Sequence, residues 1–149
     1  MADHVVKRFD EFAKPADVER IMKGVGRLLE TNPYQGQKFI EMLKNDNLES
    51  WRIAAPQDTD GRFSIYYVTI KSGRDFPTHL HDDVYAVVYI VEGKGHVVLD
   101  GETYPVTPGV VVHIPPRVVH EFIADGPLSY IAISSPDFAY QDKPDFIFT

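Results

Sequence analysis

Two histidines separated by a single residue carry the clearest chemistry in this sequence. His79 and His81 open the stretch HLHDDVYAVVYIVEGKG. In an extended strand, residues i and i+2 point to the same side, so the two imidazoles would lie next to each other. Imidazole nitrogen is a good ligand for divalent Fe, Mn, Ni, Cu and Zn ions. The pair therefore predicts part of a transition-metal site, and it requires a further ligand from elsewhere in the chain.

The best third ligand is His120, in the segment PGVVVHIPPRVVH. A Pro-Gly turn begins a strand in this segment, a Pro-Pro pair ends it, and His120 opens the next strand. The chain has no cysteine, so a metal site must be built from His, Asp or Glu. His113 precedes the Pro-Pro pair and is expected to be a packing or surface residue.

The elements that must position these histidines are short strands. From residue 47 onward, runs rich in Val, Ile, Tyr and Phe alternate with turn residues. The pairs Asp60–Gly61, Asp100–Gly101 and Asp125–Gly126 suit the positive φ angles of tight hairpin turns. This pattern predicts an all-β sandwich or barrel. The expected strands are LESWRIAAP, RFSIYYVTIK, VYAVVYIVEG, GHVVLDG, TYPV, VVVHIPP, HEFIADG and LSYIAIS.

The first 46 residues have a different pattern, which predicts two short amphipathic helices. Apolar residues recur at helical spacing over 18–29, and Asn32–Pro33 offers an N-cap and a first-turn proline for a second helix reaching residue 43. We expect one domain, in which a helical segment, 1–46, packs on a barrel formed by 47–149. The tail PDFAYQDKPDFIFT is expected to add an edge strand to its own subunit or to a partner.

Composition excludes several classes of partner. The chain has 149 residues and a net charge of −7, without a basic block that could follow a phosphate backbone, so nucleic acid is not expected. The longest apolar run, 84–91, is too short to cross a bilayer, and the start of the chain does not read as a signal peptide. These features predict a soluble, cytoplasmic protein without a membrane partner.

The spacing of the histidines resembles the two motifs of the cupin superfamily. Gly73, five residues, His79-x-His81 and then Gly93 are similar to the first motif, and the Ile-Pro-Pro-x-x-x-His120 segment is similar to the second. The likeness covers about residues 65–135. It implies a double-sheet jelly-roll barrel with a metal ion inside one end, held by His79, His81 and His120. It also implies a homodimer.

One part of the first motif is missing. Cupins usually supply a glutamate ligand there, but counting forward from the histidines reaches Tyr85, and counting back from Gly93 reaches Ala86, so the segment carries one extra residue. By strand alternation, Tyr85 would face the metal as a ligand or proton donor, or Asp83 would act as a displaced carboxylate ligand. The third alternative is a site with three histidines alone.

A site of three neutral imidazoles leaves a divalent ion with its full charge, which favours anionic or enolisable substrates. Among cupins, it resembles that of cysteine dioxygenases and diketone dioxygenases. We expect an enzyme acting on a small carbonyl or carboxylate compound, as a non-heme Fe(II) dioxygenase with Tyr85 as its acid or base. The alternatives are a redox-neutral lyase, isomerase or cyclase using Zn, Mn or Ni, and a binding module without turnover.

Three further residues are expected to bind the substrate. Phe122 has the strand parity of His120, and Tyr89 has that of His81, so both would line the pocket. Arg52, in the LESWRIAA strand, could clamp a substrate carboxylate through its planar guanidinium group. Asp82 and Glu121 alternate away from the inward face and are expected to lie in solvent.

Overall fold

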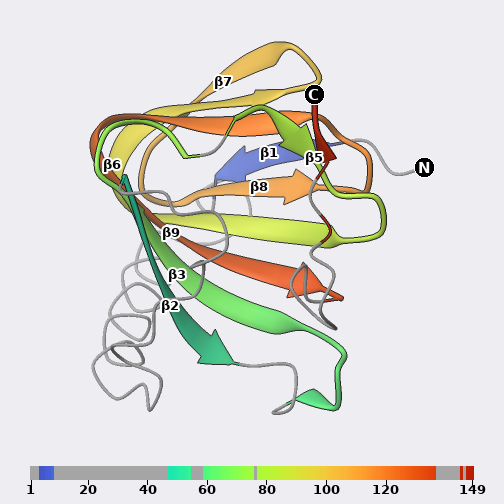
Figure 1. Ribbon diagram of the computed structural model, residues 1–149. Coiled ribbons are helices and arrows are strands. Elements are labelled where there is room, and N and C mark those ends of the chain that lie inside the picture. Colours follow the sequence, from blue (N-terminus) through green and yellow to red (C-terminus); the bar gives the residue numbers. More distant parts are fainter. Residues whose placement is uncertain (1–3, 9–46, 55–58, 76, 137–144, 146) are drawn as a thin grey trace.

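The described part of the chain consists almost entirely of β-strands. The computed structural model describes residues 4–8, 47–54, 59–75, 77–136, 145 and 147–149 (Figure 1). None of these residues belongs to a helix long and apolar enough to cross a membrane. The strands are β1 (Val5–Arg8), β2 (Leu48–Ala54), β3 (Ser64–Ile70), β4 (Gly73–Arg74), β5 (His79–Leu80), β6 (Tyr85–Leu99), β7 (Glu102–Val106), β8 (Val110–Ile114), β9 (His120–Ser135) and β10 (Ile147–Phe148).

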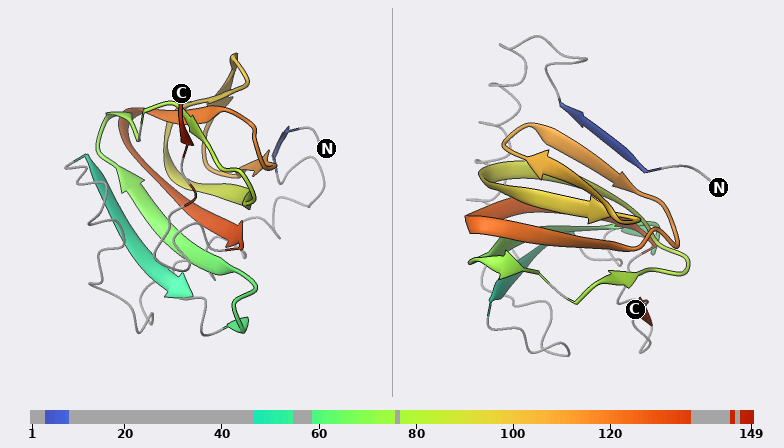
Figure 2. Two further views of the ribbon diagram at one scale, coloured as in Figure 1. Left: turned by 45° about the vertical axis from the view of Figure 1, so that its right-hand side comes forward. Right: turned by 90° about the horizontal axis from the view of Figure 1, so that it is seen from above.

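Two long strands, β6 and β9, organise the sheet. They pair with each other along most of their lengths, while the first half of β6 also pairs with β8 and its last part pairs with β7. The order β1-β8-β6-β9-β3-β2 follows from these contacts, with β4 and β5 added along the first part of β9. The sheet curls so that its two halves face each other (Figures 1 and 2). The all-β prediction is confirmed for these residues. The strands form one continuous sheet, because β6 and β9 take part in both halves.

Glycines mark the place where β6 and β9 bend together. Between Gly93 and Gly95 the pairing advances two residues on β6, but the partners Leu128 and Ala124 lie four residues apart on β9. A Cβ atom on Gly93 would lie 2.0 Å from the carbonyl oxygen of Pro127, and φ is +88° there. Only a residue without a side chain allows the strands to approach this closely, and the bulge turns them from one half of the sheet into the other.

The Asp-Gly pairs have different outcomes. Asp100 and Gly101 have φ angles of 50° and 83° and join β6 to β7 in a two-residue hairpin, as predicted. Asp60 and Gly61 also have positive φ angles and lie in the connection between β2 and β3. The hairpin expected at Asp125–Gly126 is wrong, because this pair lies inside β9, where it belongs to the bulge opposite Gly93 and Gly95.

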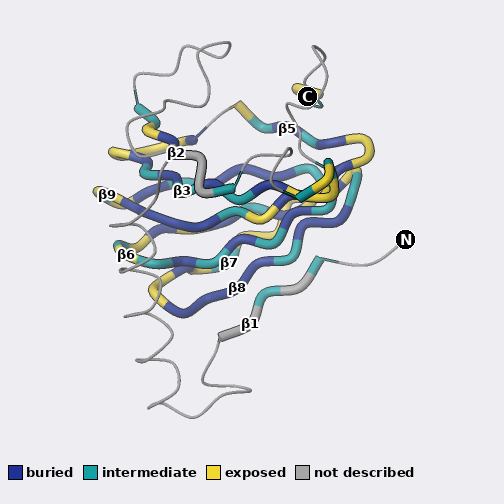
Figure 3. Tube along the Cα trace, turned by 90° about the horizontal axis from the view of Figure 1, so that it is seen from below, coloured by how far each residue is buried: buried dark blue, intermediate teal, exposed yellow. Residues whose placement is uncertain are grey.

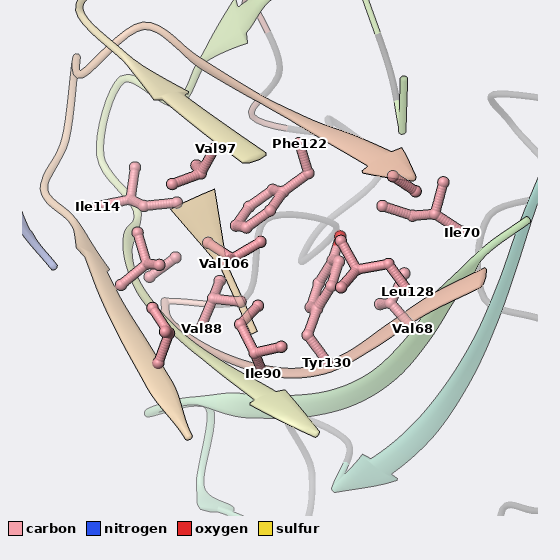
Figure 4. Packing of buried hydrophobic residues seen from close by; sticks show 14 of the residues in the cluster. Val68, Ile70, Val88, Ile90, Val97, Val106, Ile114, Phe122, Leu128 and Tyr130 are labelled. Carbon is pink, nitrogen blue, oxygen red and sulfur yellow. The ribbon is translucent and has the colours of Figure 1, made fainter. Parts of the chain in front are cut away.

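The core lies between the two halves of the curled sheet. Buried residues alternate with more accessible ones along β3 and along the first half of β6, as expected for strands with one face on a core (Figure 3). Ile70, Ile90, Leu99 and Leu128 are fully buried and pack with valines, Phe122 and other apolar residues (Figure 4). Each such side chain contributes roughly 2 kcal/mol through its burial. This packing fixes the strands that carry the histidines.

The N-terminal segment differs from the expectation where it can be compared. The helices expected over 18–43 lie outside the described residues. The described part of segment 1–46 is a strand, β1, which pairs antiparallel with β8. Val5 and Val6 are β-branched, and β8 would otherwise present an unpaired edge, so an added strand satisfies its backbone groups. The segment therefore extends the sheet at this point.

Candidate metal centre

The three predicted histidine ligands come together in the structure. His79 lies on β5 directly opposite His120, the first residue of β9, and His81 follows the end of β5. The centres of the rings of His79 and His120 are 4.3 Å apart, and the ring of His81 lies 5.1 Å from each. The nitrogen atoms that could act as ligands lie within 4.8 Å of one another. All three residues are buried, with exposed fractions of 2–7%.

Main-chain carbonyl groups hold the orientation of each ring. The Nδ1 atom of His79 lies 2.9 Å from the carbonyl oxygen of Pro77, and that of His120 lies 2.9 Å from the oxygen of Val118. The Nδ1 atom of His81 contacts the carbonyl oxygen of Asp145. A carbonyl oxygen only accepts hydrogen bonds, so each Nδ1 atom carries the proton and donates it. In a neutral ring, Nε2 then keeps the lone pair that can bind a metal ion.

Burial keeps the rings uncharged. It lowers the pKa of His79 from 6.5 to about 4, against the opposing effect of the Pro77 carbonyl. Burial likewise lowers the pKa of His120 to well below its usual value, and the charges of His79 and His81 add to this effect. Burial lowers the pKa of His81 as well, although the Asp145 carbonyl and carboxylate oppose it. At neutral pH the three rings are therefore in the form that a metal ion requires.

No carboxylate joins this group among the described residues. Asp83, the displaced ligand considered above, is exposed, and its backbone N–H donates to the Asp145 carboxylate. Asp82 is also exposed, as predicted, and pairs with Arg117 at 2.9 Å. A set of three neutral, buried imidazoles fits a divalent transition-metal ion and leaves the charge of that ion uncompensated. The three histidines thus fit the metal ion that the resemblance to cupins implies.

The structure places Ala86, not Tyr85, on the inward face of β6. Ala86 belongs to the buried core, whereas Tyr85 lies on the alternate face, with its hydroxyl 3.5 Å from His113 Nδ1. β5 ends at Leu80 and β6 begins at Tyr85, so strand alternation does not continue from the histidines to Tyr85. A methyl group therefore occupies the inward position where counting back from Gly93 expects the glutamate.

The three predicted substrate-binding residues lie in different places. Phe122 shares the inward face of β9 with His120, is buried, and stacks on Tyr130 with ring centres 4.9 Å apart. Tyr89 lies on the same face of β6 as Tyr85, and burial raises its pKa to about 12. Arg52 lies on β2 opposite Tyr66, and its side chain is outside the described part of the structure. Of Phe122 and Tyr89, whose side chains the structure describes, Phe122 lies on the face that carries a histidine ligand.

Two buried acidic residues were missed by sequence reasoning. Asp75 is 3% exposed, and its carboxylate accepts the N–H of Phe122 at 3.0 Å while its own N–H donates to the Phe122 carbonyl at 3.0 Å. Its charge and, above all, burial raise the pKa of Tyr130 well above the usual range. Glu121 was expected in solvent but is buried, because Arg74 on β4 lies against it with an Nε–Oε2 distance of 3.2 Å. Neither position has a signal in the local sequence.

Comparison with known proteins agrees with this geometry. Residues 66–134 match the model of the cupin domain family. An uncharacterized protein of Methanocaldococcus jannaschii is 35% identical over 81 residues, which are 53% of this chain and 65% of that protein. L-ectoine synthase of Saccharophagus degradans is 29% identical over 105 residues, 69% of this chain and 78% of the enzyme. Quercetin 2,3-dioxygenase of Bacillus subtilis is 30% identical over 70 residues, 47% of this chain and 21% of the enzyme.

The fold is also shared with solved structures. A cupin 2 domain-containing protein from Halorhodospira halophila superposes with a TM-score of 0.63 and 20% identity, covering 97% of this chain and 86% of that one. At this identity the likeness concerns the fold alone. The match to the cupin domain family over residues 66–134, the shared fold and the group of three histidines agree with one another: this part of the chain is a cupin domain.

Proposed function

We propose that this protein is a metal-dependent enzyme that acts on a small carbonyl or carboxylate compound. His79, His81 and His120 would hold one divalent transition-metal ion through their Nε2 atoms. One observation carries the proposal: three buried rings lie together, and each is fixed by a carbonyl oxygen at Nδ1. A divalent ion bound there supplies a Lewis acid for a carbonyl or carboxylate oxygen and, if it is iron, a centre for reactions with dioxygen.

The protein's own residues would prepare the substrate for this chemistry. The imidazoles carry no charge, so an anionic substrate would be attracted by the uncompensated charge of the ion. Phe122 and Tyr130 would form an apolar wall next to His120 and exclude water from that side. Arg52 remains a candidate for binding a substrate carboxylate, and Tyr89 a candidate for lining the entrance. For Tyr85 we propose a role in proton transfer. A Tyr85→Phe variant would test this role, because it should lower turnover while leaving the metal content unchanged.

Two kinds of reaction fit this site. The first is oxidation by a non-heme Fe(II) dioxygenase, which the absence of a carboxylate ligand among the described residues and the likeness to quercetin 2,3-dioxygenase support. The second is a redox-neutral lyase, isomerase or cyclase reaction with Zn, Mn or Ni. It is favoured by the likeness to L-ectoine synthase, which covers 78% of that enzyme against 21% of the dioxygenase. The homodimer and the cytoplasmic location stay predictions.

Metal analysis tests the proposal directly. We expect protein purified without added metal to hold about one divalent ion per chain, His120→Ala to lose it, and His96→Ala to retain it, because His96 is an exposed residue of β6. Full metal content in His120→Ala would contradict the three-histidine site. Oxygen consumption with diketones, thiols and hydroxy acids then separates the two reactions: uptake by the iron form supports the dioxygenase, and conversion without uptake supports the redox-neutral enzyme. A bound ion without any turnover would leave a binding module.

A further inference from the structure

The C-terminal residues return to the strand that carries His79. β10 pairs antiparallel with β5, with Ile147 opposite Leu80 and Phe148 opposite His79. The backbone N–H of Thr149 donates to the Thr78 carbonyl at 3.0 Å, and its hydroxyl lies 3.2 Å from the same oxygen. In Figure 1, the dark-red arrow that ends at C lies beside β5. The edge strand expected from the tail thus forms on the same subunit.

Asp145, at the start of this segment, contacts the metal centre in two ways. Its main-chain carbonyl accepts the Nδ1–H of His81. Its carboxylate accepts three consecutive backbone N–H groups, from Asp82 at 2.8 Å, Asp83 at 2.9 Å and Val84 at 3.2 Å. Hydrogen bonds to an ionised group are stronger than those between neutral groups. One residue therefore fixes both the ring of His81 and the turn that follows it.

The three histidines differ in how their rings are held. Pro77 and Val118 are each two residues before the histidine that they orient, so His79 and His120 are set by their own local backbone. The partner of His81 lies 64 positions away in the sequence. The main chain of His81 is held separately, because its carbonyl accepts the backbone N–H of Arg117 at 2.7 Å. The orientation of this one ring thus depends on the docking of the C-terminal segment.

We propose that Asp145 is a positioning residue of the metal centre, and that Asp145 together with residues 147–149 acts as a strap that completes this centre when it docks on β5. The inference rests on the proposed function, since it assumes an ion bound by the three histidines. Partners of metal-binding histidines typically change metal affinity by 10–100-fold when they are removed. Because binding couplings are reciprocal, a bound ion in turn stabilises the docked strap.

The test uses the full chain and Zn²⁺ as the probe, with two readouts. Zn²⁺ affinity is measured by competition with a chelator, and amide hydrogen exchange at residues 82–84 is measured in the metal-free protein. We expect Asp145→Ala to weaken Zn²⁺ binding about 10-fold and to accelerate exchange at these amides. A chain ending at residue 144 removes the carbonyl partner of His81 as well, so it should weaken binding further.

Asp125→Ala is the matched control, because the carboxylate of Asp125 lies on the surface and forms an exposed ion pair with Lys94 at 3.5 Å. We expect this variant to bind Zn²⁺ like the wild type. Wild-type affinity in Asp145→Ala would overturn the inference while leaving the metal site in place. If the wild-type protein itself bound no Zn²⁺, or bound it no better than His120→Ala, the proposed function would fail, and the inference would fail with it.

Discussion

Each imidazole of the metal centre is held through Nδ1 by a main-chain oxygen, and each is buried away from solvent. The carbonyl bond selects the tautomer, and burial lowers the pKa, so the two effects together present a neutral ring with Nε2 as the coordinating atom. Such a site is costly to protonate. The cost appears as a dependence of stability on pH when the ion is removed.

Metal-free protein should lose stability in mild acid. The pKa of His79 falls from 6.5 to about 4 on folding, so between these values the unfolded chain binds more protons than the folded one. The free energy of unfolding should therefore decrease as the pH falls from 6.5 toward 4, by about 3 kcal/mol from this residue alone. Urea unfolding in the presence of EDTA measures it. His79→Gln should flatten this dependence relative to His96→Gln, and an unchanged slope would contradict the assignment.

The histidine ligands of the site could be predicted from the sequence. The side of the strand to which each neighbouring residue points could not. His79, His81 and His120 stand in recognisable motifs, and their convergence is confirmed. Tyr85 and Ala86 could not be separated, because alternation along a strand is lost where the backbone leaves extended geometry between β5 and β6. Only the structure shows which of them continues the core-facing row of β6.

At the scale of elements, three glycines separate two reasons for having no side chain. One reason is the close approach of a neighbouring strand, and the other is a positive φ angle. A Cβ atom on Gly95 would lie 2.2 Å from the Ile123 carbonyl oxygen, while one on Gly101 would meet nothing within 4 Å but would adopt a φ of +83°. Gly93 combines a 2.0 Å contact with a φ of +88°. We expect Gly101→Ala to cost about 1 kcal/mol, Gly95→Ala about 2–3 kcal/mol, and Gly93→Ala the most. Urea midpoints give the order, and an equal loss in all three variants would contradict it.

Local sequence signals predicted the backbone angles of the Asp-Gly pairs better than the place of each pair in the sheet. Asp100–Gly101 forms its hairpin because the two residues themselves accept the required φ angles. The same dipeptide at Asp125–Gly126 serves as a bulge within β9, since β6 pairs on both sides of it. A dipeptide indicates only the local angles that it tolerates. The pairing partners that decide between a turn and a bulge lie far away in the sequence, as for Gly93 and Leu128, which are 35 residues apart.

At the scale of the whole molecule, metal binding should appear as stability. An ion that binds only the folded state at 100 times its dissociation constant adds about 2.7 kcal/mol. For a chain of this size, this raises Tm by roughly 5–10 °C. Thermal unfolding with and without Zn²⁺ measures the shift, which EDTA should reverse. His120→Ala should show no rise, and an equal rise in that variant would place the ion elsewhere on the protein.

Contacts between distant parts of the chain were beyond sequence reasoning. Asp145 meets His81 across 64 positions, and Asp75 meets Phe122 across 47, without a motif that links them. Glu121 follows the alternation rule for an outward residue, yet β4 returns along β9 and places Arg74 over it. Such pairs are products of the complete topology, because the buried charge and its partner come from strands that join only in the folded sheet.

The docking of Thr149 against Thr78 also has a practical consequence. Phe148 pairs with the ligand His79, and Thr149 is the next residue. Any segment fused after Thr149 for purification would therefore begin close to the metal centre. A polyhistidine tag attached there would face the site at an effective concentration of about millimolar. Its imidazoles would compete for the same ion, so a tag placed at the other end of the chain gives the cleaner measurement of metal content.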